Sequence, residues 1–405
     1  MKRIMRGFEN FISYNDALGK ISMKLKIKTE TLCIASALNR ISASDVLSNE
    51  YVPDNDKSAV DGYAIISDDT MNASIENPAR LDIKYTVRPG QVPGSIDHGE
   101  CAEVYTGSYI PINSNAVVKA EDTENHGDSI MVYRHLNMNE NISKMGEDLY
   151  PGFNIIKKDS LIEAQHIAAM EAVKIEKIDV YKKIKLCIIN TGDEVYYNSV
   201  RNSTGYMLKS FYSMPYIDVI GPFISRDDKN EIMNIINKNI NNCDIMIITG
   251  GSSIGRYDLV GDVLSGLGKC IFSGVSIKPG RTVSLFNLNG RPVISCSGLP
   301  VAALISSYFI ISKIIKNTFN ISIEKPISGR LSSNVSNRIG FTKFQICRTY
   351  ISDNNVIIEP LKTTGSGLIS SVIKGNSFII INDGLEGIAM NSIVMAYLIG
   401  DVKWA

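Results

Sequence analysis

The residues with the clearest chemical potential lie at 249–258, in the sequence TGGSSIGRYD. A short apolar run with β-branched side chains at 245–248 precedes them and predicts a buried strand. The adjacent glycines Gly250 and Gly251 let the backbone turn sharply and bring N–H groups close to a ligand. A helix predicted at 257–267 would point its positive end at the same place, where Asp258 could cap the helix or bind a metal ion. The stretch therefore predicts an anion site, with further donors from the hydroxyls of Thr249, Ser252 and Ser253.

Four other loops of similar chemistry follow predicted strands, namely TGDE at 191–194, RDD at 226–228, SIKPGR at 276–281 and SGLP at 297–300. The strands that precede the five loops are predicted at 184–189, 217–224, 245–248, 270–277 and 293–295. Helices predicted at 205–214, 229–240, 257–267 and 301–316 alternate with them. This alternation predicts a largely parallel sheet in a three-layer α/β/α sandwich. Because ligands bind at the carboxyl ends of strands in such folds, the five loops are expected to share one edge.

These loops would bring together groups of opposite charge. They carry the carboxylates Glu194, Asp227 and Asp258 and the cations Lys278 and Arg281, beside N–H groups exposed by glycine. Carboxylates and phosphates are the usual ligands of Mg²⁺, and cations with N–H groups suit a phosphate or another oxyanion. Each residue taken singly is as well explained by an N-cap, a turn or a solvated charge. Their gathering at one edge favours a metal-assisted reaction at a phosphate or pyrophosphate.

The length of 405 residues exceeds one ordinary domain, and the rest of the sequence predicts three more. Apolar residues at helical spacing at 11–25, 31–38 and 163–173 predict a discontinuous helical linker domain over 1–44 and 144–180. Short β-like runs separated by turns predict a β domain inserted at 45–143. The sandwich would occupy 181–320, and renewed β character predicts a C-terminal β-barrel over 321–405. The expected fold is therefore a multidomain α/β protein.

The composition excludes several classes of function. Lysine plus arginine equals aspartate plus glutamate at 42 each, so no global field would recruit nucleic acid or an anionic membrane. The seven cysteines are scattered without a C-x-x-C pair, and the four histidines are scattered too, which argues against a disulfide framework or a zinc site. The basic N-terminus has no apolar segment typical of a signal peptide, and the apolar stretch at 299–315 is interrupted by serines and a lysine. A cytoplasmic protein without a membrane span is expected.

Seven motifs occur in the order found in one known family. They are DNDKSAVDGYAI, YTGSYIP, GEDLYPG, NTGDEV, SRDD, TGGSSIGRYD and SIKPGR. In these motifs the chain resembles the MoeA-type molybdopterin molybdotransferases, which include the C-terminal part of gephyrin. The motif TGGSSIGRYD also fits the single-domain MogA type and CinA-like proteins, whereas the DGYA segment and the inserted β domain single out the MoeA type. The resemblance covers nearly the whole chain and implies that the α/β domain is MogA-like.

The resemblance implies an elongated homodimer of four-domain subunits. Members of the family insert molybdate into adenylylated molybdopterin with a divalent cation such as Mg²⁺, which gives molybdenum cofactor and AMP; tungstate is an alternative substrate to molybdate. The active cleft of the family lies between the α/β domain of one subunit and the β domain of the other. The same resemblance implies no nucleic-acid or membrane partner.

The resemblance also assigns roles to individual residues. Glu194, Asp227 and Asp258 would bind the metal and, with the partner subunit's Asp61, take part in catalysis. The other substrate-binding residues would be Lys57, Thr106, Asp148, Thr249, Gly250, Gly251, Ser252, Ser253, Lys278, Arg281, Gly298 and Pro300. Among these, Lys57 is our own hypothesis for a contact to molybdate. Two segments depart from the family pattern, since SGLP replaces Pro-Gly-Asn-Pro at 297–300 and little of the Tyr-Asp-Ser-Asn motif is kept at 205–211.

Two other functions fit parts of the sequence. Adenylylation of molybdopterin by ATP needs only the α/β domain, and the loops around Asp61 and Asp148 argue against it. A non-catalytic scaffold of the gephyrin type is disfavoured by the intact set of acidic residues. The molybdotransferase is therefore the leading hypothesis.

Overall fold

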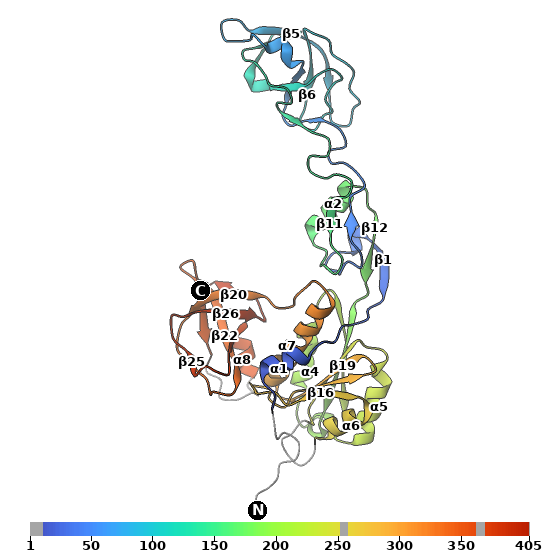
Figure 1. Cartoon of the computed structure of the whole chain (residues 1–405), viewed down its shortest axis with the longest axis vertical. Helices are drawn as coiled ribbons and strands as arrows, with labels where there is room; N and C mark the ends of the chain where they lie inside the picture. The colour runs from blue at the N-terminus through green and yellow to red at the C-terminus, as the bar shows by residue number, and fades with distance from the viewer. Residues whose placement is uncertain (1–10, 252–257, 362–368, 405) are drawn as a thin grey trace, which may run out of the picture.

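The computed structural model describes residues 11–251, 258–361 and 369–404 and shows an elongated chain (Figure 1). A β domain lies at one end of the long axis and a linker domain lies in the middle. An α/β domain and a C-terminal β-barrel lie side by side at the other end. The multidomain α/β architecture predicted from the sequence is confirmed. In the described ranges no helix is long and apolar enough to cross a membrane.

The β domain is built on a six-stranded sheet with the order β7-β4-β6-β5-β9-β8. Its strands are β4 (Gly62–Ile65), β5 (Ala79–Val87), β6 (Glu100–Val104), β7 (Ala116–Lys119), β8 (Thr123–Asn125) and β9 (Ser129–Val132), with the 3-10 turns η2 (Ser67–Thr70) and η3 (Ala120–Asp122). The paired residues Tyr63 and Val118 face one core, and the next pair, Ala64 and Val117, faces another. Side chains alternate along each strand, so both faces of the sheet are buried.

The linker domain joins segments from both sides of the β domain, but it is not the helical domain that the sequence predicts. β1 (Thr29–Cys33) pairs with β12 (Lys177–Tyr181), and β2 (Val46–Leu47) pairs with β11 (Asn154–Ile156). The described helical elements are α2 (Ala164–Ala172) and the 3-10 turn η1 (Ile34–Ser36). The helix predicted at 31–38 is wrong because its first residues pair with a strand that is distant in sequence, and this pairing overrides local propensity.

The connection between the linker and the β domain consists of two strands. β3 (Lys57–Ser58) and β10 (Ile142–Ser143) pair antiparallel where the chain enters and leaves the β domain. Because β2 pairs inside the linker domain, the chain enters the β domain after Leu47 rather than at the predicted residue 45.

The first helix lies away from the linker domain. α1 (Tyr14–Lys20) begins where Ser13 accepts a hydrogen bond from Asp16 N, and it is shorter than the predicted helix at 11–25. The ring of Tyr14 packs edge-on against Phe309 of the α/β domain and Phe344 of the barrel, at centroid distances of 5.5 and 5.4 Å. This helix therefore joins the α/β domain to the barrel.

The α/β domain is the predicted three-layer sandwich. Its sheet has the order β14-β13-β15-β19-β18-β16, in which β13, β14, β15 and β19 are parallel and the last two pairings are antiparallel. The strands are β13 (Ile184–Thr191), β14 (Ile217–Ser225), β15 (Ile245–Thr249), β16 (Lys269–Ser273), β18 (Ser284–Leu288) and β19 (Arg291–Cys296). The helices are α3 (Asp193–Tyr196), α4 (Ser203–Tyr212), α5 (Lys229–Ile240), α6 (Leu259–Leu267) and α7 (Pro300–Thr318).

Each face of this sheet packs against two helices. Ile188 of β13 belongs to the core that includes residues of α4 and α7, whereas its neighbour Ile189 belongs to the core that includes residues of α5 and α6. Because successive side chains of a strand point to opposite faces, the apolar strands predicted from the sequence are buried on both sides.

The C-terminal domain contains a closed barrel of five strands. The strands are β20 (Pro326–Leu331), β22 (Thr342–Ser352), β23 (Asn355–Pro360), β24 (Ser377–Ile381) and β26 (Ile393–Leu398), and the pairing of β22 with β24 closes the ring. Smaller elements are β21 (Val335–Ser336), β25 (Gly387–Ile388), β27 (Lys403–Trp404) and α8 (Ile369–Lys374). The predicted strand at 270–277 is divided, because β17 (Ile277–Lys278) leaves the sandwich and pairs with β22 of the barrel.

Candidate active site

The loops after the parallel strands meet at one edge of the α/β sheet, as the sequence predicts. Backbone hydrogen bonds join the strand ends directly, since Gly192 N donates to Ser225 O at 3.2 Å and Gly250 N donates to Cys296 O at 3.1 Å. β16 is antiparallel to β18, which is antiparallel to β19, so β16 runs in the direction of the parallel strands. The loop that follows β16 therefore lies at the same edge, two strands beyond β19.

Gly250 lies where three of these loops touch. Its φ is +93°, and a Cβ added there would lie 2.2 Å from the carbonyl oxygen of Thr191. A Cβ added to Gly298 would lie 3.6 Å from the Cα of Gly250, so the two turns are separated by little more than a methyl group. The Oγ1 of Thr204 on α4 donates to the carbonyl oxygen of Gly298 at 2.6 Å and fixes that loop. Only glycine permits this packing, which determines where the N–H groups of the turns lie.

The other predicted anion-binding residues differ in their positions. Thr249 is buried at the end of β15, and its Oγ1 accepts a hydrogen bond from Nδ2 of Asn190 at 2.5 Å. This hydroxyl therefore helps to hold the strand ends together, and its role as a donor to a ligand stays a prediction. Pro300 is the first residue of α7, where its fixed φ suits a helix start. Ser252 and Ser253 lie outside the described residues.

Carboxylates gather beside the glycine turns at the ends of β13 and β14. Burial raises the pKa of Asp227, and the nearby negative charges of Glu194 and Asp193 raise it further. Asp193 also accepts a hydrogen bond on Oδ1 from the backbone N of Asp227 at 3.2 Å. The structure thus brings Glu194 and Asp227 together, as predicted, and adds Asp193. The only sequence signal for Asp193 is its place next to Glu194 in the same turn.

Two neighbouring aspartates serve as helix caps. Asp228 accepts hydrogen bonds from the backbone N of Asn230 and of Glu231, so it caps α5 and leaves Asp227 outside the helix. Asp258 caps α6, since its Oδ1 accepts from Gly261 N at 2.9 Å, and burial raises its pKa. Within the described part of the chain, no three His, Cys, Asp or Glu side chains are arranged to hold a metal ion. The predicted metal set of Glu194, Asp227 and Asp258 is therefore not assembled in this conformation.

Lys278 and Arg281 line a cavity of about 1030 Å³ between the α/β domain and the barrel. The cavity continues from the first turn of α7, where Val301 lines it, to β22. Gly280 is held there by Ser306 of α7, whose Oγ donates to the carbonyl oxygen of Gly280 at 3.3 Å. The cavity therefore begins at the same helix terminus that follows the loop at 297–300.

The barrel contributes more positive charge to this cavity. Arg338 and Lys343 also line it, Lys343 lies next to Lys278 in the pairing of β22 with β17, and none of the described residues that line the cavity is acidic. Burial lowers the pKa of Lys343, and the charge of Lys278 lowers it further. The sequence analysis missed Arg338 and Lys343, because no motif or spacing links the barrel to the SIKPGR loop. The cavity has the charge expected of an anion site.

Asp61 is held at the other end of the molecule, in the β domain. Its Oδ1 accepts hydrogen bonds from the backbone N of Thr106 at 2.7 Å and from the Oγ1 of Thr106 at 2.8 Å. These bonds lower the pKa of Asp61, so the exposed side chain is a carboxylate at neutral pH. Asp61 and Thr106, two of the predicted site residues, are therefore in direct contact.

The neighbouring residues of the acidic loops have separate environments. Nζ of Lys57 forms an ion pair with Asp54 at 2.9 Å and lies 5.0 Å from the centre of the Tyr109 ring. The hydroxyl of Tyr109 also donates to Asp54 at 2.8 Å. Lys57 is therefore already neutralised, which argues against the hypothesis that it binds molybdate. Asp148 is exposed in the turn between β10 and β11.

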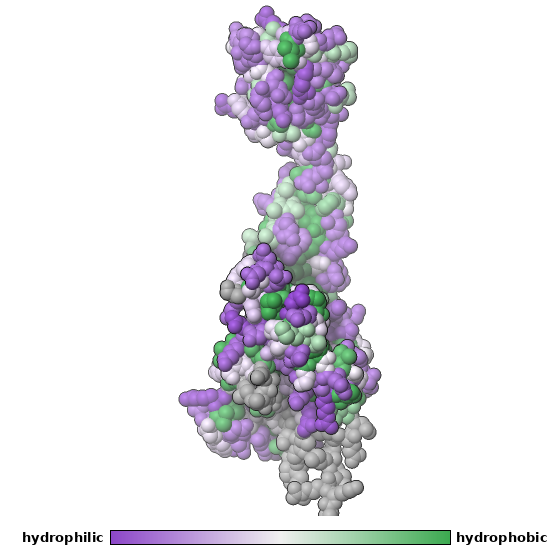
Figure 2. All heavy atoms as spheres, turned by 90° about the vertical axis from the view of Figure 1, so that its left-hand side faces the viewer, coloured by the Kyte–Doolittle hydropathy of each residue, from purple (hydrophilic) through white to green (hydrophobic). Residues whose placement is uncertain are grey.

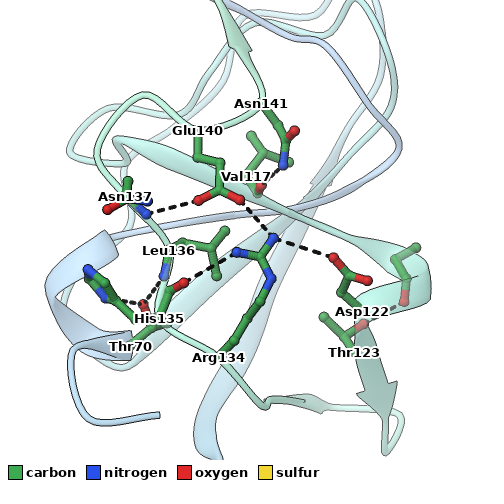
Figure 3. Close-up of polar contacts among 11 residues, drawn as sticks. Thr70, Val117, Asp122, Thr123, Arg134, His135, Leu136, Asn137, Glu140 and Asn141 are labelled. Atoms are coloured by element: carbon green, nitrogen blue, oxygen red, sulfur yellow. Dashed lines mark hydrogen bonds and ion pairs between the residues drawn. The ribbon is translucent and has the colours of Figure 1, made fainter. Parts of the chain in front are cut away.

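A polar network around Arg134 joins segments of the β domain (Figure 3). The guanidinium of Arg134 bonds Glu140 at 2.7 Å and Asp122 of η3 at 3.4 Å. The segment of η3 contacts the site directly, because Ala120 N donates to the carbonyl oxygen of Asp61 at 3.1 Å. Arg134 thus ties two segments of the β domain around the loop that carries Asp61.

Three family models match consecutive parts of the chain. They are the MoeA N-terminal region (domain I and II) at 12–173, a model described as "Probable molybdopterin binding domain" at 187–317, and the MoeA C-terminal region (domain IV) at 328–399. A Methanocaldococcus jannaschii protein assigned to molybdopterin biosynthesis is 31% identical over 387 residues, which cover 92% of each chain. The chain belongs to the MoeA family.

Other MoeA-family proteins match over similar lengths. A Staphylococcus aureus protein named molybdopterin molybdenumtransferase is 25% identical and covers 93% of each chain. The crystal structure of the molybdopterin biosynthesis MoeA protein from Pyrococcus horikoshii superposes with a TM-score of 0.84 at 26% identity, and covers 96% of this chain and 100% of that one. The whole architecture, rather than one domain, is therefore that of MoeA proteins.

The two acidic sets of this MoeA-family chain are far apart. The β domain that holds Asp61 and the α/β domain that holds Glu194 lie at opposite ends of the elongated molecule, with the linker domain between them (Figure 1). A single chain in this conformation does not form a site that contains both residues.

Proposed function

We propose that this MoeA-family chain is a molybdopterin molybdenumtransferase, which inserts molybdate into adenylylated molybdopterin and releases AMP. The observation that carries the proposal is the order of groups along one sheet edge. Carboxylates lie at the ends of β14 and β13, and neighbouring glycine turns lie at the ends of β15 and β19. The cationic cavity lies next to them, on the side of β16. Such a row suits a substrate with a diphosphate linkage at its centre and an oxyanion near one end.

The glycine turns would hold the phosphoanhydride. Negative charge develops on the leaving phosphate as the linkage breaks and AMP departs, and fixed positive dipoles at that point stabilise it. The backbone at Gly250 and Gly251 and the N-terminal ends of α6 and α7 converge on this part of the edge. They provide N–H groups and the positive ends of helix dipoles.

The acidic turn would attract a divalent cation such as Mg²⁺, although its carboxylates are not arranged to hold one in this conformation of the described residues. The raised pKa of Asp227 shows that burial and repulsion from Glu194 and Asp193 disfavour its charge, and a bound cation would relieve both effects. Oxygen ligands of this kind are those that Mg²⁺ prefers. When bound, the ion supplies positive charge to the oxygens of the breaking linkage. We assign Asp258 to positioning the start of α6, because one of its oxygens is used as the cap.

The cationic cavity would receive molybdate. Molybdate is a dianion, and Lys278, Arg281, Arg338 and Lys343 surround a space with no acidic group among its described lining residues. Burial and the nearby charge of Lys278 both lower the pKa of Lys343, and a bound anion would offset both effects. The same argument disfavours Lys57, whose charge Asp54 already balances.

A second copy of the chain would complete the site. Asp61, Thr106 and Asp148 lie in or next to the β domain and cannot reach the α/β domain of their own chain in this conformation. Apolar surface is exposed over the middle of the molecule (Figure 2). In the linker domain, Leu47 and Phe153 are 50% and 36% exposed. Burial of such surface favours self-association. We therefore propose a homodimer whose cleft combines the α/β domain of one copy with the β domain of the other, working in the cytoplasm.

Incubation of the purified protein with adenylylated molybdopterin, Mg²⁺ and molybdate tests the proposal. We expect AMP release that depends on molybdate and is abolished by Glu194→Gln. ATP consumption with molybdopterin would instead indicate an adenylyltransferase, and absence of both reactions would support a scaffold of the gephyrin type. Replacement of molybdate by tungstate in the same assay shows whether the cavity distinguishes the two oxyanions.

The role of the cavity has a matched test. Lys343→Met should raise the KM for molybdate about tenfold or more, because a charge that contacts a dianion contributes roughly 1.5–3 kcal/mol. Lys374→Met, in another part of the same domain, should leave this KM unchanged. An equal effect of the two substitutions would argue against molybdate binding in the cavity.

A further inference from the structure

Two tyrosines lie directly after the acidic turn of the α/β domain. Tyr196 ends α3, the helix that begins with Asp193 and Glu194, and Tyr197 follows it. Their rings meet edge to face at a centroid distance of 5.2 Å and an interplanar angle of 82°. Both side chains are open to solvent, since Tyr196 is 47% and Tyr197 is 65% exposed. Apolar rings at such exposure leave area free for contact with a ligand.

Arg226 fixes the orientation of this pair. Its guanidinium lies 5.5 Å from the centre of the Tyr196 ring, and its Nε donates to Oε1 of Glu231 at 2.9 Å. Arg226 follows β14 and directly precedes Asp227, so the residue that contacts the tyrosine pair belongs to the same loop as a carboxylate of the acidic turn. Arg226 covers one side of the Tyr196 ring, and the remaining exposure leaves other ring surface accessible.

The turn after the tyrosines is also fixed. Val200 N donates to the carbonyl oxygen of Glu194 at 2.8 Å, and the Oγ of Ser199 donates to the same oxygen at 3.0 Å. The segment that carries the rings is therefore folded back on the acidic turn. Pre-positioned aromatic rings bind a planar ligand with little further loss of conformational entropy.

We propose that the exposed ring of Tyr197 stacks on the adenine ring of the adenylyl half of the substrate, and that Tyr196, backed by Arg226, meets the edge of the same base. The assignment rests on the proposed function and adds a subsite to it. An adenine presents a flat π-face, and stacking on tyrosine and arginine side chains recognises such a face without reading its polar edge.

The order of strands decides between the two ring systems of the substrate. The tyrosine pair lies by β13 and β14, whereas the cationic cavity begins at the loop after β16 at the far side of the sheet. β13 and β16 are four strand positions apart, roughly 19 Å at the usual spacing. Molybdenum stays with the pterin half, so the pterin must lie toward the cavity. The ring on the opposite side of the glycine turns is then adenine.

Direct binding measurements test the subsite independently of turnover. Calorimetric titration of the full-length protein with AMP and with ribose 5-phosphate, both in Mg²⁺, separates the base from the sugar phosphate. The double variant Tyr196→Ala/Tyr197→Ala should weaken AMP binding about tenfold and change ribose 5-phosphate binding less than twofold, because base stacking on an aromatic ring has this size. The double phenylalanine variant should bind AMP as the wild type does.

A control variant comes from the barrel. Arg348 lies 5.1 Å from the ring of Tyr350, so Tyr350→Ala removes the same kind of arginine–tyrosine contact away from the sheet edge. It should leave AMP binding unchanged. A loss in Tyr350→Ala equal to that in the double alanine variant would overturn the assignment.

Other outcomes also decide the matter. Unchanged AMP binding in the double alanine variant, no AMP binding by the wild type, or equal losses for AMP and ribose 5-phosphate would each overturn the subsite. If the double alanine variant loses binding of 6-hydroxymethylpterin but keeps binding of AMP, the substrate lies in the opposite orientation, and the adenine assignment is overturned. If AMP binding depends on the base but molybdate-dependent AMP release is absent, the proposed function is refuted and the subsite is kept. If the release occurs but the variants bind AMP as the wild type does, the subsite is refuted and the proposed function is kept.

Discussion

Gly250→Ala tests whether backbone contact between the loops creates the site. The added Cβ would lie 2.2 Å from the carbonyl oxygen of Thr191, whereas ordinary contacts of this kind are at least 3.4 Å long, so the loops must separate by more than 1 Å. The φ of +93° adds about 1–2 kcal/mol for a residue with a Cβ, and the steric overlap adds about 1–3 kcal/mol. We expect the α/β domain to lose about 2–5 kcal/mol of its free energy of unfolding.

The effect on catalysis should be larger than the effect on folding. A displacement of about 1 Å at a reacting group lowers rates by about a hundredfold, so kcat for molybdate-dependent AMP release should fall by at least that factor. Urea denaturation followed by fluorescence and circular dichroism gives the stability, and chromatographic measurement of AMP gives the rate at a temperature where the variant is folded.

Gly290→Ala is the matched control. Gly290 has a similar φ of +86°, but no atom lies within 4 Å of the position of an added Cβ, and it occupies the turn between β18 and β19 at the other edge of the sheet. It should cost about 1 kcal/mol and leave kcat unchanged. If Gly250→Ala is folded and retains activity within threefold of Gly290→Ala, the contact between the loops is not what organises the site.

Three other predictions follow from the same structure. Asp227→Asn should stabilise the metal-free protein above the raised folded-state pKa of Asp227, where partial desolvation of the carboxylate and repulsion from Glu194 and Asp193 are a net cost, and should abolish both the rise in Tm with Mg²⁺ and AMP release; a less stable variant in Mg²⁺-free buffer would contradict this. Asp258→Ser should keep the cap of α6 and most stability, whereas Asp258→Ala should lose about 1 kcal/mol in urea denaturation, and equal losses would refute the capping role. Asp61→Asn and Glu194→Gln should each be inactive as pure dimers, yet mixing them should restore part of the AMP release through hybrid dimers. No recovery despite demonstrated subunit exchange would exclude a shared cleft.

The sequence determined most of the α/β domain and the order of its loops. The predicted strands ended at residues that the structure places at one edge, because buried strands and amphipathic helices have different periods of apolar residues. The right-handed connection of parallel strands then leaves few arrangements for the loops that follow them. Glu194, Asp227 and the glycines of the 249–251 turn were accessible to sequence reasoning for this reason.

The local chemistry of neighbouring residues required the structure. Asp227 and Asp228 are equivalent as candidate caps in sequence, and only the backbone geometry at the start of α5 assigns the cap to Asp228. Only the structure shows that Asn190 of β13 donates to the hydroxyl of Thr249 and that Asp54 of the same loop pairs with Lys57. The residue type limits which hydrogen bonds and ion pairs a side chain can form, and the neighbouring residues in the fold determine which of them it forms.

Contacts between distant segments were decided by the tertiary structure alone. β1 pairs with β12, although the whole inserted β domain separates them in sequence. Residues 31–33 of the predicted helix therefore form a strand. Lys343 and Arg338 meet Lys278 and Arg281 because β17 leaves one domain and pairs with β22 of another. The separation of Asp61 from Glu194 follows from the extended linker. Periodicity reports which face of an element is buried, but it contains no information about the segment that covers that face, because this choice depends on the packing of the whole chain.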